Sequence, residues 1–165
     1  MTECETLIRQ MDSEFEELQF SAFGFEDAWQ IGQYLVERGR RDSLPIAIDI
    51  SLNGQTLFHA ALPSSSPDNE AWIVRKNRVV NCFHKSSLYI ATKLRQASAT
   101  IEEKYGLSSQ KFAPSRGAVP IRIRGVGVVG TVTVSGLPDH GDHRMVVETL
   151  RHHLAIMRPG TVETL

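Results

Sequence analysis

The spacing of apolar residues along the first half of the chain changes from a helical period to a strand period. Apolar side chains three and four positions apart predict a helix over residues 3–19 and a stronger one over Phe25–Arg41. A short extended piece, residues 18–23, is expected after the first helix. The core-facing side of the second helix is predicted to consist of Phe25, Ala28, Trp29, Gly32, Leu35 and Val36.

Beyond the second helix, two runs with a period of two, at residues 45–52 and 55–62, flank Asn53 and Gly54. This residue pair tolerates the positive φ that both central positions of a type I′ turn require, so it predicts a β-hairpin. A second strand pair is expected at residues 120–124 and 126–135, broken at Gly125.

Helical patterns fill the remaining segments. They predict helices over residues 68–83, 86–96, 100–105 and 142–157. Hairpin-paired strands alternating with helices indicate an α/β fold of the α+β type, with a mainly antiparallel sheet of about five strands. Residues 1–165 are expected to form a single domain, with a core over residues 20–156 and a frayed tail at residues 158–165.

Composition and charge narrow the classes of partner. The chain has 165 residues, of which 41% are hydrophobic and 22% charged, and its formal net charge is −1. This balance argues against binding to nucleic acid or to an anionic membrane. No apolar run approaches the roughly 20 residues that span a bilayer. Two cysteines and an acidic N-terminal segment are typical of a reducing compartment, so we expect a cytoplasmic protein.

One lysine interrupts an apolar stripe. On the helix over residues 68–83, Lys76 falls within the stripe that contains Trp72, Val79, Val80 and Phe83, whereas Arg75 points elsewhere. A lysine in that position must extend to the edge of the sheet, pair with a carboxylate, or line a pocket. The functional reading is a contact to an anion or a lysine of lowered pKa.

A second polar cluster, residues 139–143, opens the closing helix. Asp142 is predicted as its N-cap, and His143 lies on the same side as the apolar inner face. A metal site would use His140 and His143 with a neighbouring aspartate, but the fixed zinc signatures are absent, so no metal is expected. His152 and His153 are expected at the surface.

Two segments carry a family resemblance. The patterns W-I-V-R-K-N-R-V-V-N-C-F-H-K-S-S, residues 72–87, and V-P-I-R-I-R-G-V-G-V-V-G-T-V-T-V-S-G-L-P, residues 119–138, resemble an uncharacterised bacterial and fungal branch of the haem-degrading domain superfamily. That superfamily includes GlcG-like proteins, the HbpS type and the C-terminal domain of PduO-type adenosyltransferases. The resemblance implies a three-layer α/β/α domain that forms a homo-oligomer. Arg116 and Thr133 stand where relatives often have glycine.

The sequence therefore predicts a homo-oligomeric protein that binds a small ligand, with haem or another tetrapyrrole as the class that the resemblance implies. In this hypothesis Lys76 meets a propionate and His143 lies near the iron. The alternative is a non-catalytic oligomeric adaptor, and metal-assisted hydrolysis ranks last. No catalytic residue is assigned. The candidate ligand-binding residues are Trp72, Arg75, Lys76, Ser135, Asp142 and His143.

Overall fold

The computed structural model describes residues 1–157, and the predicted frayed tail lies outside the described residues. These residues form six helices and five strands. In chain order the elements are α1 (Glu3–Glu17), β1 (Gln19–Phe20), α2 (Phe25–Arg41), β2 (Ala47–Leu52), β3 (Gln55–Ala61), α3 (Pro67–Phe83), α4 (Ser87–Gln96), α5 (Ile101–Tyr105), β4 (Ala118–Ile123), β5 (Gly127–Ser135) and α6 (Gly141–Met157).

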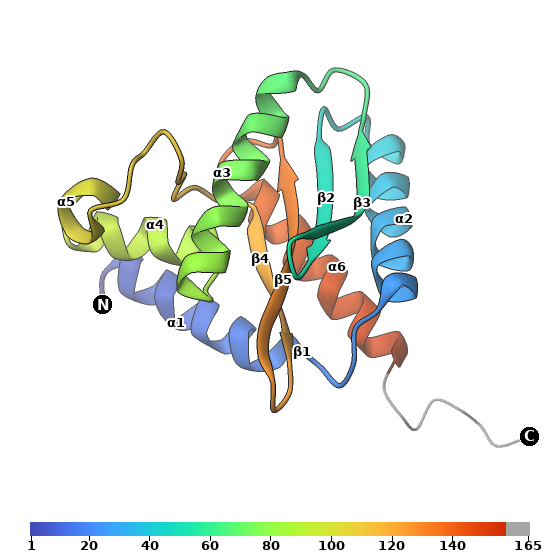
Figure 1. Ribbon diagram of the computed structural model, residues 1–165, viewed down its shortest axis with the longest axis horizontal. Coiled ribbons are helices and arrows are strands. Elements are labelled where there is room, and N and C mark those ends of the chain that lie inside the picture. Colours follow the sequence, from blue (N-terminus) through green and yellow to red (C-terminus); the bar gives the residue numbers. More distant parts are fainter. Residues whose placement is uncertain (158–165) are drawn as a thin grey trace, which may run out of the picture.

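The strands form one mixed sheet in the order β1-β4-β5-β2-β3. The short strand β1 runs parallel to β4, and all other neighbours are antiparallel. Helix α3, with α4 beside it, covers one face of the sheet, and α2 and α6 cover the other (Figure 1). Helix α1 packs against α4 near the β1–β4 edge. The predicted three-layer α/β/α class with a mainly antiparallel sheet is confirmed.

The predicted hairpin at Asn53 and Gly54 is also confirmed. Their φ angles are 50° and 82°, as the tight turn between β2 and β3 requires. Glycine takes this conformation without a side-chain penalty, and asparagine tolerates it better than most residues. The turn sets the register in which Leu52 pairs with Gln55 and Ser51 with Thr56, and a bulge then shifts the pairing so that Ile50 lies opposite Phe58.

The two faces of the sheet differ in polarity. Towards α2 and α6 the buried residues are apolar, among them Ile48, Ile50, Val132 and Val134. Towards α3 several are polar, including Asp49, Thr133 and Ser135. Asn77 of α3 donates to Oδ1 of Asp49 over 3.1 Å and accepts from Oγ1 of Thr133 over 2.5 Å. Helix α3 is thus held to the sheet partly by hydrogen bonds.

The core-facing side of α2 differs from the predicted one. Phe25 and Trp29 are 69% and 53% exposed, and Ile31, which the prediction omitted, is fully buried. The reason lies at Gly32, where an added Cβ would overlap the ring of Phe58. The helix therefore buries Ala28, Ile31, Gly32 and Leu35, whereas the exposed Trp29 contacts the ring of Phe58 on edge strand β3.

The prediction that His153 lies at the surface is wrong. His153 is 5% exposed, and its Nε2 lies 3.0 Å from Oδ1 of Asp27, which belongs to the first turn of α2. The pair joins α6 to α2 within one layer of the fold. His152, one position earlier, is exposed and stacks on the ring of Tyr34 with a centroid distance of 4.4 Å.

Candidate functional site

Four of the six predicted ligand-binding residues line one cavity of about 370 Å³, which we call the Lys76 cavity. It is formed by the first turns of α3, the segment before β4, the end of β5 and the start of α6. The predicted residues at its wall are Trp72, Lys76, Ser135 and Asp142. A cavity of this size lies within the range that small-molecule ligands occupy.

The ammonium group of Lys76 is almost completely engaged by the protein. Its Nζ donates to the carbonyl oxygens of Arg116 (2.9 Å) and Val134 (2.8 Å), and it lies 3.7 Å from Oδ2 of Asp142. The side chain is 2% exposed. Burial lowers the pKa of Lys76 to about 8, against the opposing charge of Asp142. Lys76 therefore ties the segment before β4 to the end of β5.

Gly117 makes room for this lysine. Its φ is 123°, in the region that favours glycine, and an added Cβ would lie 2.6 Å from Nζ of Lys76 and overlap the carbonyl oxygen of Val134. No other residue fits here without moving the lysine. The glycine and the lysine thus form one structural unit, although they are 41 positions apart (117 minus 76) in the sequence.

Asp142 does not act as the predicted N-cap, because α6 begins one residue before it at Gly141. Its carboxylate instead accepts from the backbone N–H groups of Leu137 (2.7 Å) and Gly136 (3.4 Å). Burial raises the pKa of Asp142, and the charge of Lys76 opposes the rise. Asp142 therefore shapes the turn between β5 and α6.

Arg75 is not among the residues that line the Lys76 cavity. Its guanidinium lies 4.3 Å from the ring centroid of Trp72 and donates to the carbonyl oxygen of Ser109 over 3.2 Å. Because the cation stacks on the indole, Arg75 supports the Trp72 side chain in the cavity wall and does not line the cavity itself.

His143 lies in a different cavity, of about 340 Å³, between α1, the start of α4 and α6. We call it the His143 cavity. Its wall includes Gln10, Glu14, Leu88, His140, Arg144 and Arg151. The structure therefore does not bring Lys76 and His143 to one ligand.

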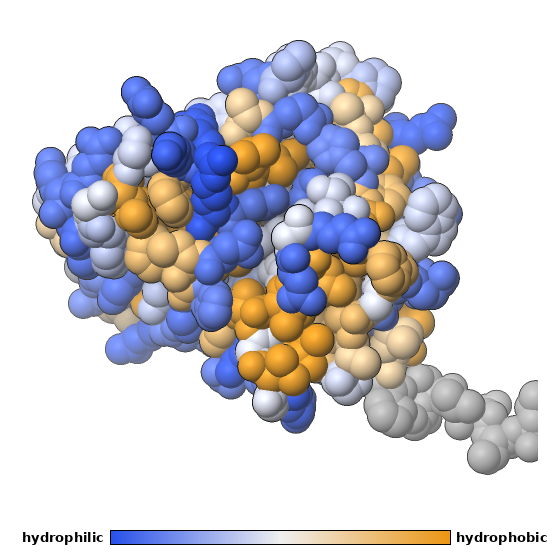
Figure 2. All heavy atoms as spheres, viewed as in Figure 1, coloured by the Kyte–Doolittle hydropathy of each residue, from blue (hydrophilic) through white to orange (hydrophobic). Residues whose placement is uncertain are grey.

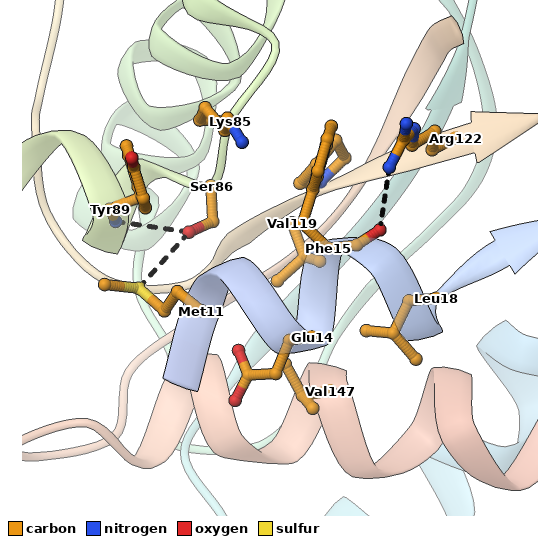
Figure 3. A pocket seen from close by; sticks show the side chains of 11 residues that line it. Met11, Glu14, Phe15, Leu18, Lys85, Ser86, Tyr89, Val119, Arg122 and Val147 are labelled. Carbon is orange, nitrogen blue, oxygen red and sulfur yellow. Dashed lines mark hydrogen bonds between the residues drawn. The ribbon is translucent and has the colours of Figure 1, made fainter. Parts of the chain in front are cut away.

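The His143 ring is oriented by a buried carboxylate. Its Nε2 lies 2.8 Å from Oε2 of Glu14, which α1 directs towards α6 (Figure 3). Burial raises the pKa of Glu14, but hydrogen bonds from His143 and Gln10 outweigh it, so the net pKa is lowered. The ionised carboxylate only accepts, so Nε2 carries the proton. Nδ1 of His143 is buried and has no partner among residues 1–157.

A third, smaller cavity of about 190 Å³ lies between the other two, and we call it the Arg116 cavity. It shares Leu88 and His140 with the His143 cavity, and Ser115 and Arg116 with the Lys76 cavity. Nε of Arg116 is buried without a hydrogen-bond partner among the described residues. The sequence patterns did not single out Arg116 as a binding residue; its only signal was an arginine where relatives often have glycine.

One further hollow is too small for a ligand, and residues 1–157 contain neither a metal-binding cluster nor a membrane-spanning helix. The hollow between α1, β4 and α4, drawn in Figure 3, measures about 20 Å³, room for little more than one water molecule. Within residues 1–157 no three His, Cys, Asp or Glu side chains gather in a way that would hold a metal ion. Nor does any helix in that range have the length and apolar character to cross a membrane.

Fold and cavities together define a class: a small α/β/α domain with neighbouring cavities of ligand size near the N-terminal end of α6. The chain belongs to the family of HbpS-like haem-degrading proteins, whose model matches residues 23–151. This confirms the family that the sequence patterns indicated.

Two relatives that are similar over most of their length share the name UPF0303 protein. A UPF0303 protein of Streptomyces avermitilis is 46% identical over 147 residues, which cover 89% of this chain and 90% of the relative. A UPF0303 protein of Serratia proteamaculans is 45% identical over 143 residues, covering 87% and 89% of the two chains.

Known structures agree with the architecture. The Ybr137w protein superposes with a TM-score of 0.83 at 31% identity, covering 90% of this chain and 89% of its own. HbpS superposes with a TM-score of 0.61 at 20% identity over 86% and 94% of the two chains. A PduOC:Heme complex gives 0.64 at 19% identity over 80% and 94%. The latter two likenesses show the shared fold.

Proposed function

We propose that this protein binds a tetrapyrrole, with haem as the first candidate, in the His143 cavity. The observation that carries the proposal is the state of His143: Glu14 holds its Nε2, and its Nδ1 is buried without a partner beside a cavity of about 340 Å³. Histidines that ligate metals almost always donate their other ring N–H to a carboxylate or carbonyl. The family and the haem complex of PduOC support the choice of ligand class.

The His143 cavity and the Lys76 cavity differ in whether they contain side chains that can ligate haem iron. Haem iron is held in proteins by His, Cys, Met or Tyr side chains. None of these types lines the Lys76 cavity, whereas the His143 cavity contains His140 and His143. In this proposal His143 would hold the iron, and Glu14 would fix the tautomer of its ring. Bound haem would supply a redox-active iron centre.

Access to the ligating atom requires movement. His143 is 4% exposed and its Nδ1 is covered, so α1 or the turn before α6 must shift before a haem reaches the ring. His140, which is only partly buried, lies on the wall of the same cavity. Binding is therefore expected to be slower than diffusion and to change the environment of α1.

The test is a haemin titration of the purified protein, followed by absorbance in the Soret region. We expect a saturable shift that His143→Ala weakens by about tenfold or more. The matched control is His152→Ala, because that histidine is exposed and lies outside the cavity. A titration without saturation, or equal affinities for all three proteins, would refute the proposal. A folded chain that self-associates but binds no haemin would support the adaptor function instead.

We also propose that the chain forms a homo-oligomer. Large apolar side chains remain exposed on the single chain, among them Phe25, Trp29 and, at 72%, Val126 at the β4–β5 turn. Figure 2 shows apolar residues gathered on the visible face around that hairpin. Light scattering tests this proposal, because a mass near 18.4 kDa would identify a monomer and contradict it.

The Lys76 cavity is a second candidate, for a small polar ligand. The observation that favours it is the meeting of Trp72, Lys76, Ser135 and Asp142 in one cavity of about 370 Å³. Its wall also contains Asp68 and Arg116, so both charge signs are present. Quenching of Trp72 fluorescence by an added ligand would report occupancy of the cavity. Trp29 also fluoresces, so the Trp72→Phe variant shows which part of the quenching comes from Trp72.

A further inference from the structure

The Arg116 cavity differs from its two neighbours in charge. The His143 cavity contains Glu14, Glu17 and Glu148, and the Lys76 cavity contains Asp68 and Asp142. Among the described residues no acidic side chain lines the Arg116 cavity, whereas three basic side chains do: Arg95, Arg116 and His140. A concave, basic surface without acids attracts an anion.

Local electrostatics agree with this reading. Burial lowers the pKa of His140, and electrostatic interactions with His143, Arg116, Arg95 and Arg144 lower it further. The histidine thus lies in a positive field that no acid in the cavity wall neutralises. An anion placed in the cavity would offset the repulsion between the charges of Arg95 and Arg116.

Hydrogen-bond donors are also left over. Nε of Arg116 is buried without a partner among residues 1–157, although buried polar groups are nearly always paired. The hydroxyl group of Ser115 lies at the same wall. Arg95 donates from its Nε to Sγ of Cys4 over 3.3 Å, so within residues 1–157 its two terminal amino groups remain for another acceptor.

From the charge, the unpaired donor and the size of the cavity, we infer that the Arg116 cavity is a binding site for a small oxyanion, a carboxylate or a phosphate, with Arg116 as its main contact. The planar guanidinium matches the two oxygens of such a group. A volume of about 190 Å³ limits the ligand to the oxyanion and a few further atoms.

Two sources could supply this oxyanion: a free small anion, or an acidic side chain of the tetrapyrrole proposed above. The second source is geometrically reasonable because the cavity shares Leu88 and His140 with the His143 cavity. The inference itself goes beyond the tetrapyrrole proposal, since a free anion would occupy the cavity without any haem.

The first experiment measures the ring resonances of His140 by NMR while inorganic phosphate or propionate is added at constant ionic strength. Saturable shifts are expected, and Arg116→Gln should weaken the affinity by about tenfold, as loss of a charge-assisted bidentate contact does. The control is Arg124→Gln, because Arg124 is exposed near the β4–β5 turn, away from the cavity. Equal shifts in sodium chloride, or an unchanged affinity in Arg116→Gln, would count against a free anion.

The second experiment compares haemin with its dimethyl ester, which lacks the two carboxylates. If the tetrapyrrole supplies the oxyanion, Arg116→Gln weakens haemin binding and leaves ester binding unchanged. If haemin binds to no variant but phosphate still shifts His140, the tetrapyrrole proposal fails and the oxyanion site stands. If neither anion shifts His140 and Arg116→Gln alters no haemin affinity, the oxyanion site is overturned. Circular dichroism and thermal melting of each variant verify that it is folded.

Discussion

Lys76 and Arg116 are two cationic side chains in the wall of the Lys76 cavity, and they differ in how their N–H groups are hydrogen-bonded. Both N–H···O contacts of Lys76 are short, and a carboxylate lies close by. Nε of Arg116 is buried with no partner among the described residues, while its backbone carbonyl serves the lysine. A buried cation whose N–H donors are paired within the protein stabilises the fold, and we call such a residue part of the framework. A donor left unpaired in a cavity wall is available for a ligand.

The strongest way to break this comparison is to remove the lysine. Lys76→Met leaves two buried carbonyl groups and Asp142 without their cation, and should lower the free energy of unfolding by about 4 kcal/mol. Urea denaturation measures the loss, and Lys111→Met, at an exposed position, is the control. A loss below about 1 kcal/mol would mean that Lys76 is not part of the framework.

The second test removes the space that the lysine needs. Gly117→Ala puts a Cβ 2.6 Å from Nζ of Lys76 and forces alanine to a φ of 123°, so we expect a loss of about 3 kcal/mol. Gly54→Ala is the matched control: it also has positive φ, at 82°, but nothing lies within 4 Å of the added atom. That variant should lose only about 1 kcal/mol. Equal losses in the two thermal or urea unfolding series would contradict the close approach.

The third test uses pH. The pKa of Lys76 is about 8 in the folded protein and 10.5 for the free side chain, so between these values the unfolded chain binds more protons. Stability from this group therefore rises as pH increases from 8 to 10.5, by about 3 kcal/mol. Subtracting the curve of Lys76→Met from that of the wild type isolates the effect of this side chain. A flat difference curve would contradict the lowered pKa of Lys76 in the folded protein.

The smallest effect is expected at Glu14, the buried carboxylate that contacts His143. Glu14→Gln keeps an acceptor near Nε2 but removes the charge, and should cost about 1 kcal/mol at pH 7, because a hydrogen bond to a neutral amide is weaker than one to a carboxylate. The pKa of Glu14 is lowered on folding, so its stabilisation is present above about pH 4.5 and is lost as the pH falls through the folded value. Unfolding curves at pH 7 and at acidic pH measure both. A cost independent of pH would show that the charge is irrelevant.

Local patterns predicted much of this fold because the responsible residues are neighbours in the sequence. The turn at Asn53 and Gly54 needs only two adjacent residues, and the stripe that contains Lys76 needs a few helical turns. The burial of Lys76 follows from the stripe, but its partners do not, since the carbonyl of Arg116 lies 40 positions away.

The candidate site depends on contacts that a local pattern does not contain. Glu14 and His143 are 129 positions apart, and Asp27 and His153 are 126 apart. Periodicity placed His143 on an inner face but gave no partner for it, and it placed His153 at the surface because no partner was visible. Similarly, Asp142 lies where the sequence predicts a helix cap, yet its carboxylate accepts hydrogen bonds from two N–H groups of the preceding turn.

The Glu14–His143 contact has a consequence for how the protein is made. Glu14 leaves the ribosome before His143 and the rest of α6, because it precedes the histidine by 129 positions. Because domains fold as synthesis proceeds, a nascent chain holds the carboxylate long before it holds the imidazole. An interrupted translation product that ends before α6 lacks this pair altogether, so only a chain that includes α6 can position the histidine.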